Sequence, residues 1–499
     1  MTVQTAPARR RTSTAPVASS GYDRTGSGTV DTETPVGRGP TLEQAIGWLL
    51  ATLGFLIGSR AISDNSFFTH FATGGQILDN RAVPTSDVFS FTAFGEPWTV
   101  QSWFASVWYR GLYEVGGLGL VRLGNGLLIA ALIAAVWRLT RAANTLLPRV
   151  LLTGLLLTIG TMMWTPRPLV FGLLCFVLFI ETVENERRPL WLLLPVMWVW
   201  VNTHGSFPLA FVFLGAVVVG HLIDCRQLDR RHLHVGAWLV GGTLLGAVNP
   251  LGPRLLVFPF ELLSRQEALK DVAEWKPPSF ERPGEWAFVA LLFVLVIAAK
   301  LGASWRHLLP GFGFFVTGLL AVRNINPASV VLVACAAPAL AALPGSLDGV
   351  SRGLASRAVA ATAVVVFAMV SLFAVTTPGI DYDKYPVLEV DWLEQRGLVA
   401  RPDVNLVHRD TTGNYLELRF GENASVFMDD RFDMFPQQVI DDHAELYFGG
   451  DFTEILDRYE ANAVLWSASG DFADWLRSGD GWDVTVDGED WLVAVRSVG

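Results

Sequence analysis

The chain has 499 residues, of which 51% are apolar and only 17% are charged. This low charged fraction, with apolar stretches that approach or exceed the ~20 residues needed to cross a bilayer, excludes a soluble protein and predicts a polytopic membrane protein. The three cysteines, Cys175, Cys225 and Cys335, all lie in or beside apolar stretches. Their positions exclude a disulfide framework and a cysteine-based metal site.

The net charge of −10 is unevenly distributed along the chain. From Asp381 onward there are 26 acidic and 9 basic residues, a net charge of −17, so the remainder carries +7. An acidic block of this size argues against nucleic acid as a partner.

The chain begins with a polar segment, residues 1–43, that is rich in Ser, Thr, Pro and Gly and holds scattered arginines. Because it has too few apolar residues to fold, we expect a disordered tail. The arginines indicate a cytoplasmic location for this tail. No apolar stretch precedes Ala45, so no cleavable signal peptide is expected.

Residues 44–378 form the predicted α-helical transmembrane domain, with about eleven spans. The expected spans are 44–62, 117–137, 147–165, 168–183, 189–201, 206–223, 235–248, 285–301, 306–322, 326–343 and 357–377. With a cytoplasmic N-terminus, every even-numbered turn is cytoplasmic and carries Lys or Arg, as the positive-inside rule expects. These residues are Arg138, Arg141, Arg149, Arg187, Arg188, Arg226, Arg230, Arg231, Lys300, Arg306, Arg352 and Arg357. An odd number of spans places the C-terminus outside the cytoplasm.

The first outer loop, residues 63–116, opens with a predicted helix. Phe67, Phe68 and Phe71 recur at roughly helical spacing, which is typical of a helix that lies on the membrane surface with its apolar face in the lipid boundary. Asp64 stands at the expected N-cap of this helix. Its carboxylate is either a cap only or a catalytic base that faces a lipid-borne substrate.

Unusual polar residues gather at the turns predicted to lie on the outer face. They are Asp64, His70, Asp87, Arg167, Asn202, His204, Asn249, Glu274, Lys276 and Arg323. Because ionisable groups at membrane depth are costly and often functional, we expect a shared outward-facing pocket. The alternative is that each residue anchors its own turn at the interface.

Two arginines suit a phosphate or pyrophosphate head group. Arg167 lies between two prolines, which stiffen its turn, and a fixed guanidinium binds phosphate well. Arg323 lies in a similar short turn, VRNINP. For each of them the alternative is a side chain that reaches to the interface.

Asn202 and His204, in WVNTHGSF, lie where one span ends and the next begins. A histidine here can orient substrate, exchange a proton or bind metal, or it is simply an interface residue. A metal site made of Asp64, His70 and His204 has no supporting spacing, so no metal ligand is assigned.

The second outer loop, residues 249–284, contains an amphipathic run, Leu255–Leu263, followed by EWKPPSF. It either covers a site as a lid or is a plain interfacial connection.

The C-terminal segment, residues 379–499, is predicted to be a soluble α/β domain outside the cytoplasm. Strands are expected at 404–407, 425–428 and 463–466, helices at 386–395, 452–459 and 472–477, and a β-hairpin at 482–495. The sequence MDDRFD, residues 428–433, follows an expected strand. Its aspartates can bind a cation, but the spacing favours a solvated loop.

An ordered set of motifs runs through nearly everything after residue 43. It comprises an Asp after the first span, THFATGGQIL, VPTSDVFSFTAFGEPWTVQSW, RPLVFGLL, WVNTHGSF, NPLGPRLL, EWKPPSF, VRNINP, GNYLELRF and VFMDDRFDMF. In this order they resemble a bacterial family of polytopic envelope proteins related to the C-type glycosyltransferases. Most members of this branch have no known activity.

The resemblance implies a fold and a reaction. C-type glycosyltransferases take sugar from a polyprenyl-phosphate-linked donor and act on an acceptor at the outer face. By this resemblance Asp64 is the carboxylate that serves as base or binds metal, and Arg167 or Arg323 holds the donor phosphate. The chemistry is coherent, because a lipid phosphate leaving group needs positive charge and the acceptor needs a base.

The sequence departs from the family pattern at two positions. Asn65 stands where many relatives have a second acidic residue, which weakens the case for metal, so a divalent cation is the one cofactor left open. Asn414 stands where GNYLELRF usually has a second Gly, which puts a role for that turn in doubt. A protein that binds a lipid-linked glycan without transferring it therefore stays open.

We therefore expect an inverting glycosyltransferase of the cell membrane, with Asp64 as catalytic base. Its partners would be a lipid-linked sugar donor and an envelope glycan, lipid or protein acceptor. The expected substrate-binding residues are His70, Asp87, Arg167, Asn202, His204, Glu274 and Arg323. The alternative is a non-catalytic binding or assembly protein, or a transporter, for lipid-linked glycans. A transporter predicts inverted repeats and mid-membrane ionisable groups, which the sequence lacks.

Overall fold

The computed structural model describes residues 39–270, 272–343, 352–479 and 481–497. Most of the predicted disordered tail therefore lies outside the described residues. Residues 39–499 form one compact unit, which begins at a capping box in which Thr41 accepts the backbone N–H of Gln44.

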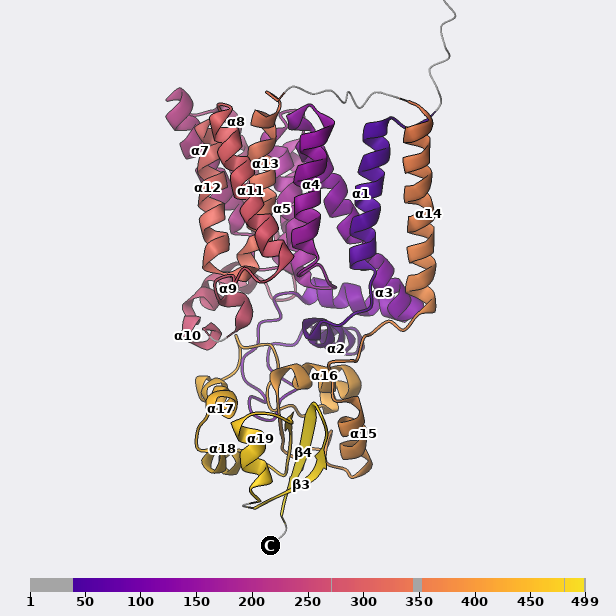
Figure 1. The fold of residues 1–499 in the computed structure, drawn as a ribbon. Helices are drawn as coiled ribbons and strands as arrows, with labels where there is room; N and C mark the ends of the chain where they lie inside the picture. The colour runs from indigo at the N-terminus through magenta and orange to yellow at the C-terminus, as the bar shows by residue number, and fades with distance from the viewer. Residues whose placement is uncertain (1–38, 271, 344–351, 480, 498–499) are drawn as a thin grey trace, which may run out of the picture. The chain divides into compact units, whose positions relative to one another are not determined.

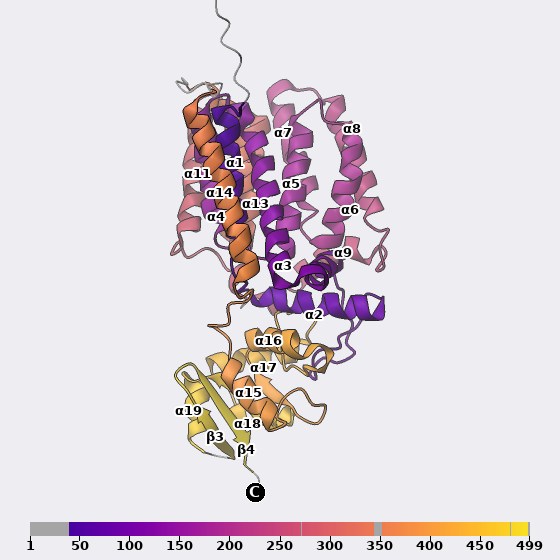
Figure 2. The same ribbon diagram turned by 90° about the vertical axis from the view of Figure 1, so that its right-hand side faces the viewer.

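Every apolar segment predicted to span is helical (Figures 1 and 2). The helices are α1 (Leu42–Gly58), α3 (Trp103–Leu139), α4 (Leu146–Gly160), α5 (Pro168–Glu184), α6 (Leu193–Thr203), α7 (Leu209–Cys225), α8 (Arg230–Leu245), α11 (Pro283–Lys300), α12 (Trp305–Leu320), α13 (Ile325–Leu340) and α14 (Leu354–Thr376). The short 3₁₀ helices η1 (Thr140–Ala143) and η2 (Leu190–Leu192) lie between them.

Three stretches of the described chain are long and apolar enough to cross a membrane: Trp103–Ala143, Pro283–Lys300 and Leu354–Thr376. Several shorter apolar helices accompany them. The protein is thus a helical membrane protein, and the number of eleven spans stays a prediction.

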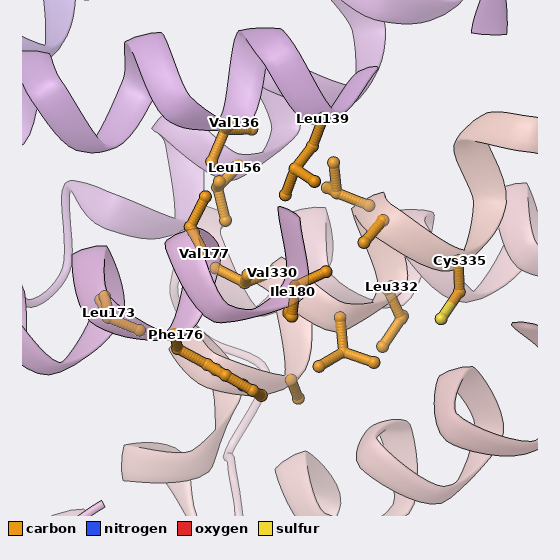
Figure 3. Close-up of a cluster of buried hydrophobic side chains, with 14 of the residues drawn as sticks. Val136, Leu139, Leu156, Leu173, Phe176, Val177, Ile180, Val330, Leu332 and Cys335 are labelled. Atoms are coloured by element: carbon orange, nitrogen blue, oxygen red, sulfur yellow. The ribbon is translucent and has the colours of Figure 1, made fainter. Parts of the chain in front are cut away.

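The helices pack around an apolar core in which side chains of α3, α4, α5 and α13 interdigitate (Figure 3). Val136, Leu156, Phe176 and Val330 are each at most 1% exposed. Burial of this kind stabilises a side chain by roughly 1.5–3 kcal/mol in a soluble protein. Between membrane helices close packing replaces much of that contribution.

The sequence analysis did not identify Arg122 as a buried charged residue inside the helix bundle. Arg122 of α3 is fully buried, and it donates to the carbonyl oxygens of Ser59 (2.9 Å) and Ala374 (3.0 Å) and to the hydroxyl of Thr377 (3.0 Å). The last carbonyls of a helix have no intrahelical partner. Arg122 satisfies those of α1 and α14 together, and so ties both helix ends to α3.

The basic turns meet at one end of the bundle, where ion pairs join them. Arg149 pairs with Glu43 (2.6 Å), and Glu181 accepts from Arg138 (3.0 Å) and Arg188 (2.5 Å). The turns predicted to be cytoplasmic therefore share one end, and the opposite end carries the remaining polar turns.

The first outer loop contains two helical stretches. Helix α3 extends through it from Trp103 and kinks at Gly116 and Gly117. Gly117 has φ +63°, which residues with a Cβ rarely adopt. The sequence predicted this helix only from residue 117, because the two glycines masked its earlier part.

The other stretch is α2 (Asn65–Asn80), the predicted surface helix. Phe67 and Phe68 are fully buried, with ring centroids 5.6 Å from Tyr109 and 5.0 Å from Tyr385. The prediction that this face lies in lipid is therefore wrong. The helical spacing was read correctly, but α3 and the C-terminal segment cover the face.

The second outer loop forms α9 (Arg254–Ser264), α10 (Gln266–Leu269) and η3 (Ala273–Trp275), and η4 (Val322–Asn324) lies beside η3. Val322 N–H donates to the Lys276 carbonyl at 3.0 Å. Arg265 donates to the Phe435 carbonyl at 2.8 Å. This loop thus connects the bundle to the C-terminal segment.

The C-terminal segment is a small α/β structure, as predicted. Its elements are α15 (Val387–Gln395), β1 (Leu406–His408), α16 (Asp410–Phe420), η5 (Gly421–Asn423), α17 (Gln437–Phe448), α18 (Phe452–Arg458), β2 (Ala463–Ser467), α19 (Asp471–Arg477), β3 (Trp482–Asp487) and β4 (Trp491–Arg496). The sheet order is β1-β2-β4-β3, with β1 and β2 parallel and the other pairs antiparallel. The predicted hairpin is confirmed, whereas α16 and α17 were not predicted.

The expected strand at 425–428 is wrong. Val426 instead forms a single bridge to the first outer loop, with its N–H donating to Phe89 O (2.9 Å) and its carbonyl accepting from Phe91 N–H (3.0 Å). Phe427 and Met428 are fully buried in the same apolar core as Phe89. The first outer loop and the C-terminal segment therefore share one core.

Candidate functional site

A cavity of about 840 Å³ lies where the outer loops meet the C-terminal segment. Turns from distant parts of the chain line it, as the sequence predicted for a shared pocket. Among the expected site residues, those in its wall are His70, Arg167, His204, Glu274 and Arg323. Asp64, Asp87 and Asn202 lie behind the wall.

Asp64 is the N-cap of α2, and it also forms an ion pair. Its Oδ1 accepts the Ser66 N–H at 3.1 Å. Its Oδ2 accepts from the Thr165 hydroxyl (2.7 Å) and from Arg167 Nε (2.6 Å). The Asp64 side chain is 9% exposed, so each of its oxygens is directed at a protein donor.

Arg167 joins three segments of the chain. It caps α5 ahead of Pro168, pairs with Asp64 through Nε and contacts Glu274 of η3 through its terminal nitrogen. Burial alone would lower the pKa of Arg167, but the two carboxylates outweigh burial and raise it. Arg167 is therefore a neutralised cation that holds the second outer loop against α2.

Arg323 is different, because no carboxylate in the described part of the chain lies within ion-pair distance of it. Its guanidinium lies over the Trp275 ring, 4.1 Å from the centroid, a cation–π contact that fixes the plane of the group. An arginine has five N–H donors and stays charged in proteins. Arg323 lines the cavity.

Two uncharged histidines accompany Arg323. Burial, with nearby Arg167, lowers the pKa of His70 to about 4. Burial, with nearby Arg323, lowers that of His204 to about 3. Because His204 Nδ1 accepts the Ser206 N–H at 3.2 Å, the neutral ring carries its proton on Nε2.

Asp87 and Asn202 do not reach the cavity. Asp87 is buried, accepts from Ser90 N (2.9 Å) and forms an ion pair with Arg431 (2.7 Å). Asn202 is buried between Trp103 Nε1 (2.9 Å) and the Gly246 carbonyl (3.1 Å). Both of these side chains hold loops together behind the site.

The loop MDDRFD contributes residues that sequence reasoning missed. The expectation of a solvated loop is wrong, because Asp429 is fully buried and Arg431 is 6% exposed. Asp430 lines the cavity and accepts from Asn414 Nδ2 at 2.7 Å. Burial, and then Asp429, raise the pKa of Asp430 to about 6. The sequence did carry one sign that these residues are buried: an acidic pair followed by Arg stands inside an apolar stretch.

Asn65 and Asn414, the two departures from the family pattern, contact each other. Asn65 Nδ2 donates to Asn414 Oδ1 at 3.0 Å. Asn414 is buried, and its amide also donates to Thr69 Oγ1 at 2.5 Å. These amides therefore link the start of α2 to α16 beside the cavity.

No group of three or more His, Cys, Asp or Glu among the described residues is arranged to hold a metal ion. Asp64, His70 and His204 accordingly do not form such a group. The cavity wall holds arginines that include Arg323, the uncharged histidines and carboxylates that include Asp430, a set suited to a phosphate ester and a hydroxyl.

No protein-family model and no curated protein matches the chain. Solved structures do match. The oligosaccharyltransferase of Archaeoglobus fulgidus tethered with an acceptor peptide has a TM-score of 0.55 at 10% identity, and covers 85% of this chain and 69% of that one. The archaeal oligosaccharyltransferase AglB from the same organism, in complex with an inhibitory peptide and a dolichol-phosphate, has a TM-score of 0.55 at 12% identity over the same shares.

ArnT from Cupriavidus metallidurans, bound to undecaprenyl phosphate, has a TM-score of 0.48 at 13% identity over 92% of this chain and 98% of that one. That likeness is too weak to support an argument. At such low identities the oligosaccharyltransferase matches show the fold alone. The chain therefore has the fold of a C-type glycosyltransferase, which confirms the predicted resemblance for the fold.

Proposed function

We propose that this protein is a membrane glycosyltransferase that moves a sugar from a polyprenyl-phosphate-linked donor to an acceptor at the outer face of the membrane. The observation that carries the proposal is the open guanidinium of Arg323 in a cavity that also holds the carboxylate of Asp430. The fold adds support, since oligosaccharyltransferases that share it were solved with an acceptor peptide in one structure and with a dolichol-phosphate in another.

In this proposal Arg323, rather than Arg167, holds the donor phosphate. As the bond between sugar and phosphate breaks, negative charge grows on the phosphate oxygens, and fixed donors there lower the barrier. Arg323 and His204 both line the cavity, and His204 carries its proton on Nε2. Arg167 is already matched by two carboxylates.

Asp64, the base favoured by the sequence, acts here by positioning. It starts α2 and holds Arg167, which in turn holds the second outer loop through Glu274. His70 and Glu274 complete the wall around the donor.

Arg323→Ala is expected to weaken binding of undecaprenyl phosphate by about 10- to 100-fold, because a hydrogen bond to a charged group contributes roughly 1.5–3 kcal/mol. Binding is measured with the full chain in lipid nanodiscs. Arg254→Ala, which removes an exposed arginine of α9, is the charge-matched control. Equal affinity in the two variants would remove Arg323 from the phosphate site, and competition by inorganic phosphate separates head-group from lipid-tail recognition.

The membrane orientation follows from the basic end of the bundle. We propose that this end is cytoplasmic and that the cavity and the C-terminal segment lie outside. A reporter fused after the last residue is expected to be active outside the cytoplasm. Activity inside would reverse the orientation and take the cavity away from an outer acceptor.

The reaction itself is tested in cells that lack the gene. We expect mass spectrometry of envelope glycans and glycolipids to show the loss of one sugar unit. Wild type should restore it and Arg323→Ala, expressed equally, should not. If no glycan changes on deletion, the alternative of a binding or assembly protein or a transporter for lipid-linked glycans replaces the transferase.

A further inference from the structure

We propose that Asp430 is the general base that takes the proton from the acceptor hydroxyl. The inference rests on the transferase function proposed above, and assigns the base to the C-terminal segment instead of to Asp64. A general base must have a lone pair within hydrogen-bond reach of the proton that it takes. Asp430 lines the cavity, whereas Asp64 does not.

The surroundings of Asp430 leave it able to accept a proton. A carboxylate offers about four lone-pair positions, and two side chains, those of Asn414 and Ser66, bond to Asp430. Within the described residues it has no ion pair. Asp64, in contrast, is bound by Ser66 N–H, the Thr165 hydroxyl and Arg167, so both of its oxygens already accept from protein donors.

The supports of Asp430 are rigid. Asn414 is fully buried and is fixed by Asn65 at 3.0 Å and Thr69 at 2.5 Å while it donates to Asp430. The neighbouring Arg431 is anchored to Asp87 and Asp429. A catalytic group on a loop needs such support to hold its geometry.

The charged groups around Asp430 set its basicity. Burial and the like charge of Asp429 disfavour ionisation, whereas Arg167 and the donors on Ser66 and Asn414 favour it. Arg431 has its own carboxylate partners. The result is a pKa near 6, which keeps the group mostly ionised at neutral pH and still basic enough to take a proton.

The proposed step balances in one displacement. The acceptor hydroxyl oxygen attacks the anomeric carbon and forms the new glycosidic bond. The bond from that carbon to the phosphate oxygen breaks, and the lipid phosphate leaves with the electron pair beside Arg323. The hydroxyl proton moves to Asp430, which later releases it to solvent.

The test measures transfer in glycolipid extracts of the gene-deleted cells, which supply the native donor and acceptor, after addition of purified full-length protein. Asp430→Asn is expected to lower the rate by about 100-fold or more, since general bases contribute roughly 10²–10⁴-fold. It should leave undecaprenyl phosphate binding within about threefold. Asp430→Glu should restore part of the rate, and Asp483→Asn, an exposed carboxylate on β3, should match wild type.

The pH profile separates a base from a positioning residue. The wild-type rate is expected to fall as pH drops below about 6, and this acidic limb should be absent from the residual activity of Asp430→Asn. Asp64→Asn should be slower but keep the limb. If Asp430→Asn equals Asp483→Asn, or if the limb disappears in Asp64→Asn instead, the assignment to Asp430 is overturned while the transferase stands. If the wild-type protein transfers no sugar, the proposed function is contradicted, and the assignment of Asp430 as base is contradicted with it.

Discussion

Arg431→Met is expected to lower the free energy of unfolding by about 3–5 kcal/mol, because it removes the one cation that pairs with three buried carboxylates in the described part of the chain. Arg431 contacts Asp87 (2.7 Å), Asp429 (2.5 Å) and Glu417 (3.4 Å) among the described residues. All three carboxylates are at most 1% exposed. Methionine fills much of the space but leaves these carboxylates without a cationic partner among the described residues.

The three carboxylates come from the first outer loop, from α16 and from the loop after it, so Arg431 joins the segments that form the cavity floor. Burial raises the pKa of Glu417, and Arg431 helps to keep that of Asp429 low despite burial. Arg431 also lies 4.4 Å from the Trp98 ring centroid. Loss of this residue therefore disturbs packing as well as charge.

The matched control is Arg419→Met on α16. Arg419 pairs with Asp391 (2.5 Å) and Glu394, and its side chain is 24% exposed. Exposed pairs contribute roughly 0–1 kcal/mol, so a small change is expected. Thermal unfolding of the full chain in one detergent, followed by tryptophan fluorescence, compares the two. Equal losses would show that the buried cluster is no more important than a surface pair.

The helices of the bundle could be predicted from the sequence because each depends on a local pattern of apolar residues. An apolar run between polar turns predicts a helix whatever lies beside it. The presence of Lys or Arg in every even-numbered turn also predicted which turns share an end, and the ion pairs Arg149–Glu43 and Arg138–Glu181 bear this out. The lipid-facing assignment of α2 failed because helical spacing shows that Phe67 and Phe68 share a face, but not what covers them.

The site was predictable in outline but not in its assignments. Arg167 and Asn202 looked alike in the sequence, as polar residues in short turns, yet one lines the cavity and the other is buried against Trp103. Whether each side chain reaches the cavity depends on its hydrogen-bond partner, Asp64 for Arg167 and Trp103 for Asn202. Each partner lies about a hundred residues away in the chain. Asp430 was missed for the same reason, since its partners Asn414 and Ser66 lie on two segments that are far apart in the sequence.

Asp430→Asn is expected to make the protein more stable at neutral pH while it slows transfer. Such a trade-off is typical of functional groups whose surroundings destabilise the folded state. In the folded chain burial, and then Asp429, raise the pKa of Asp430 from its ordinary value of 3.8 to about 6. Below pH ~4 both states are protonated, and Asp430 costs nothing. As pH rises from there to about 6, the unfolded state loses its proton first, so folding becomes less favourable.

Above pH ~6 the ionised Asp430 therefore lowers the free energy of unfolding by the full amount, on the order of 1–3 kcal/mol. An asparagine at this position causes no such loss. Asp430→Asn should raise the unfolding temperature at pH 7.5 and lose this advantage near pH 4, whereas Asp483→Asn should match wild type at both. The measurement is thermal unfolding of the full chain in one detergent across this pH range. A variant that is less stable than wild type at pH 7.5 would mean that the donors on Asn414 and Ser66 outweigh burial, and Asp430 would then be a structural anion rather than a poised base.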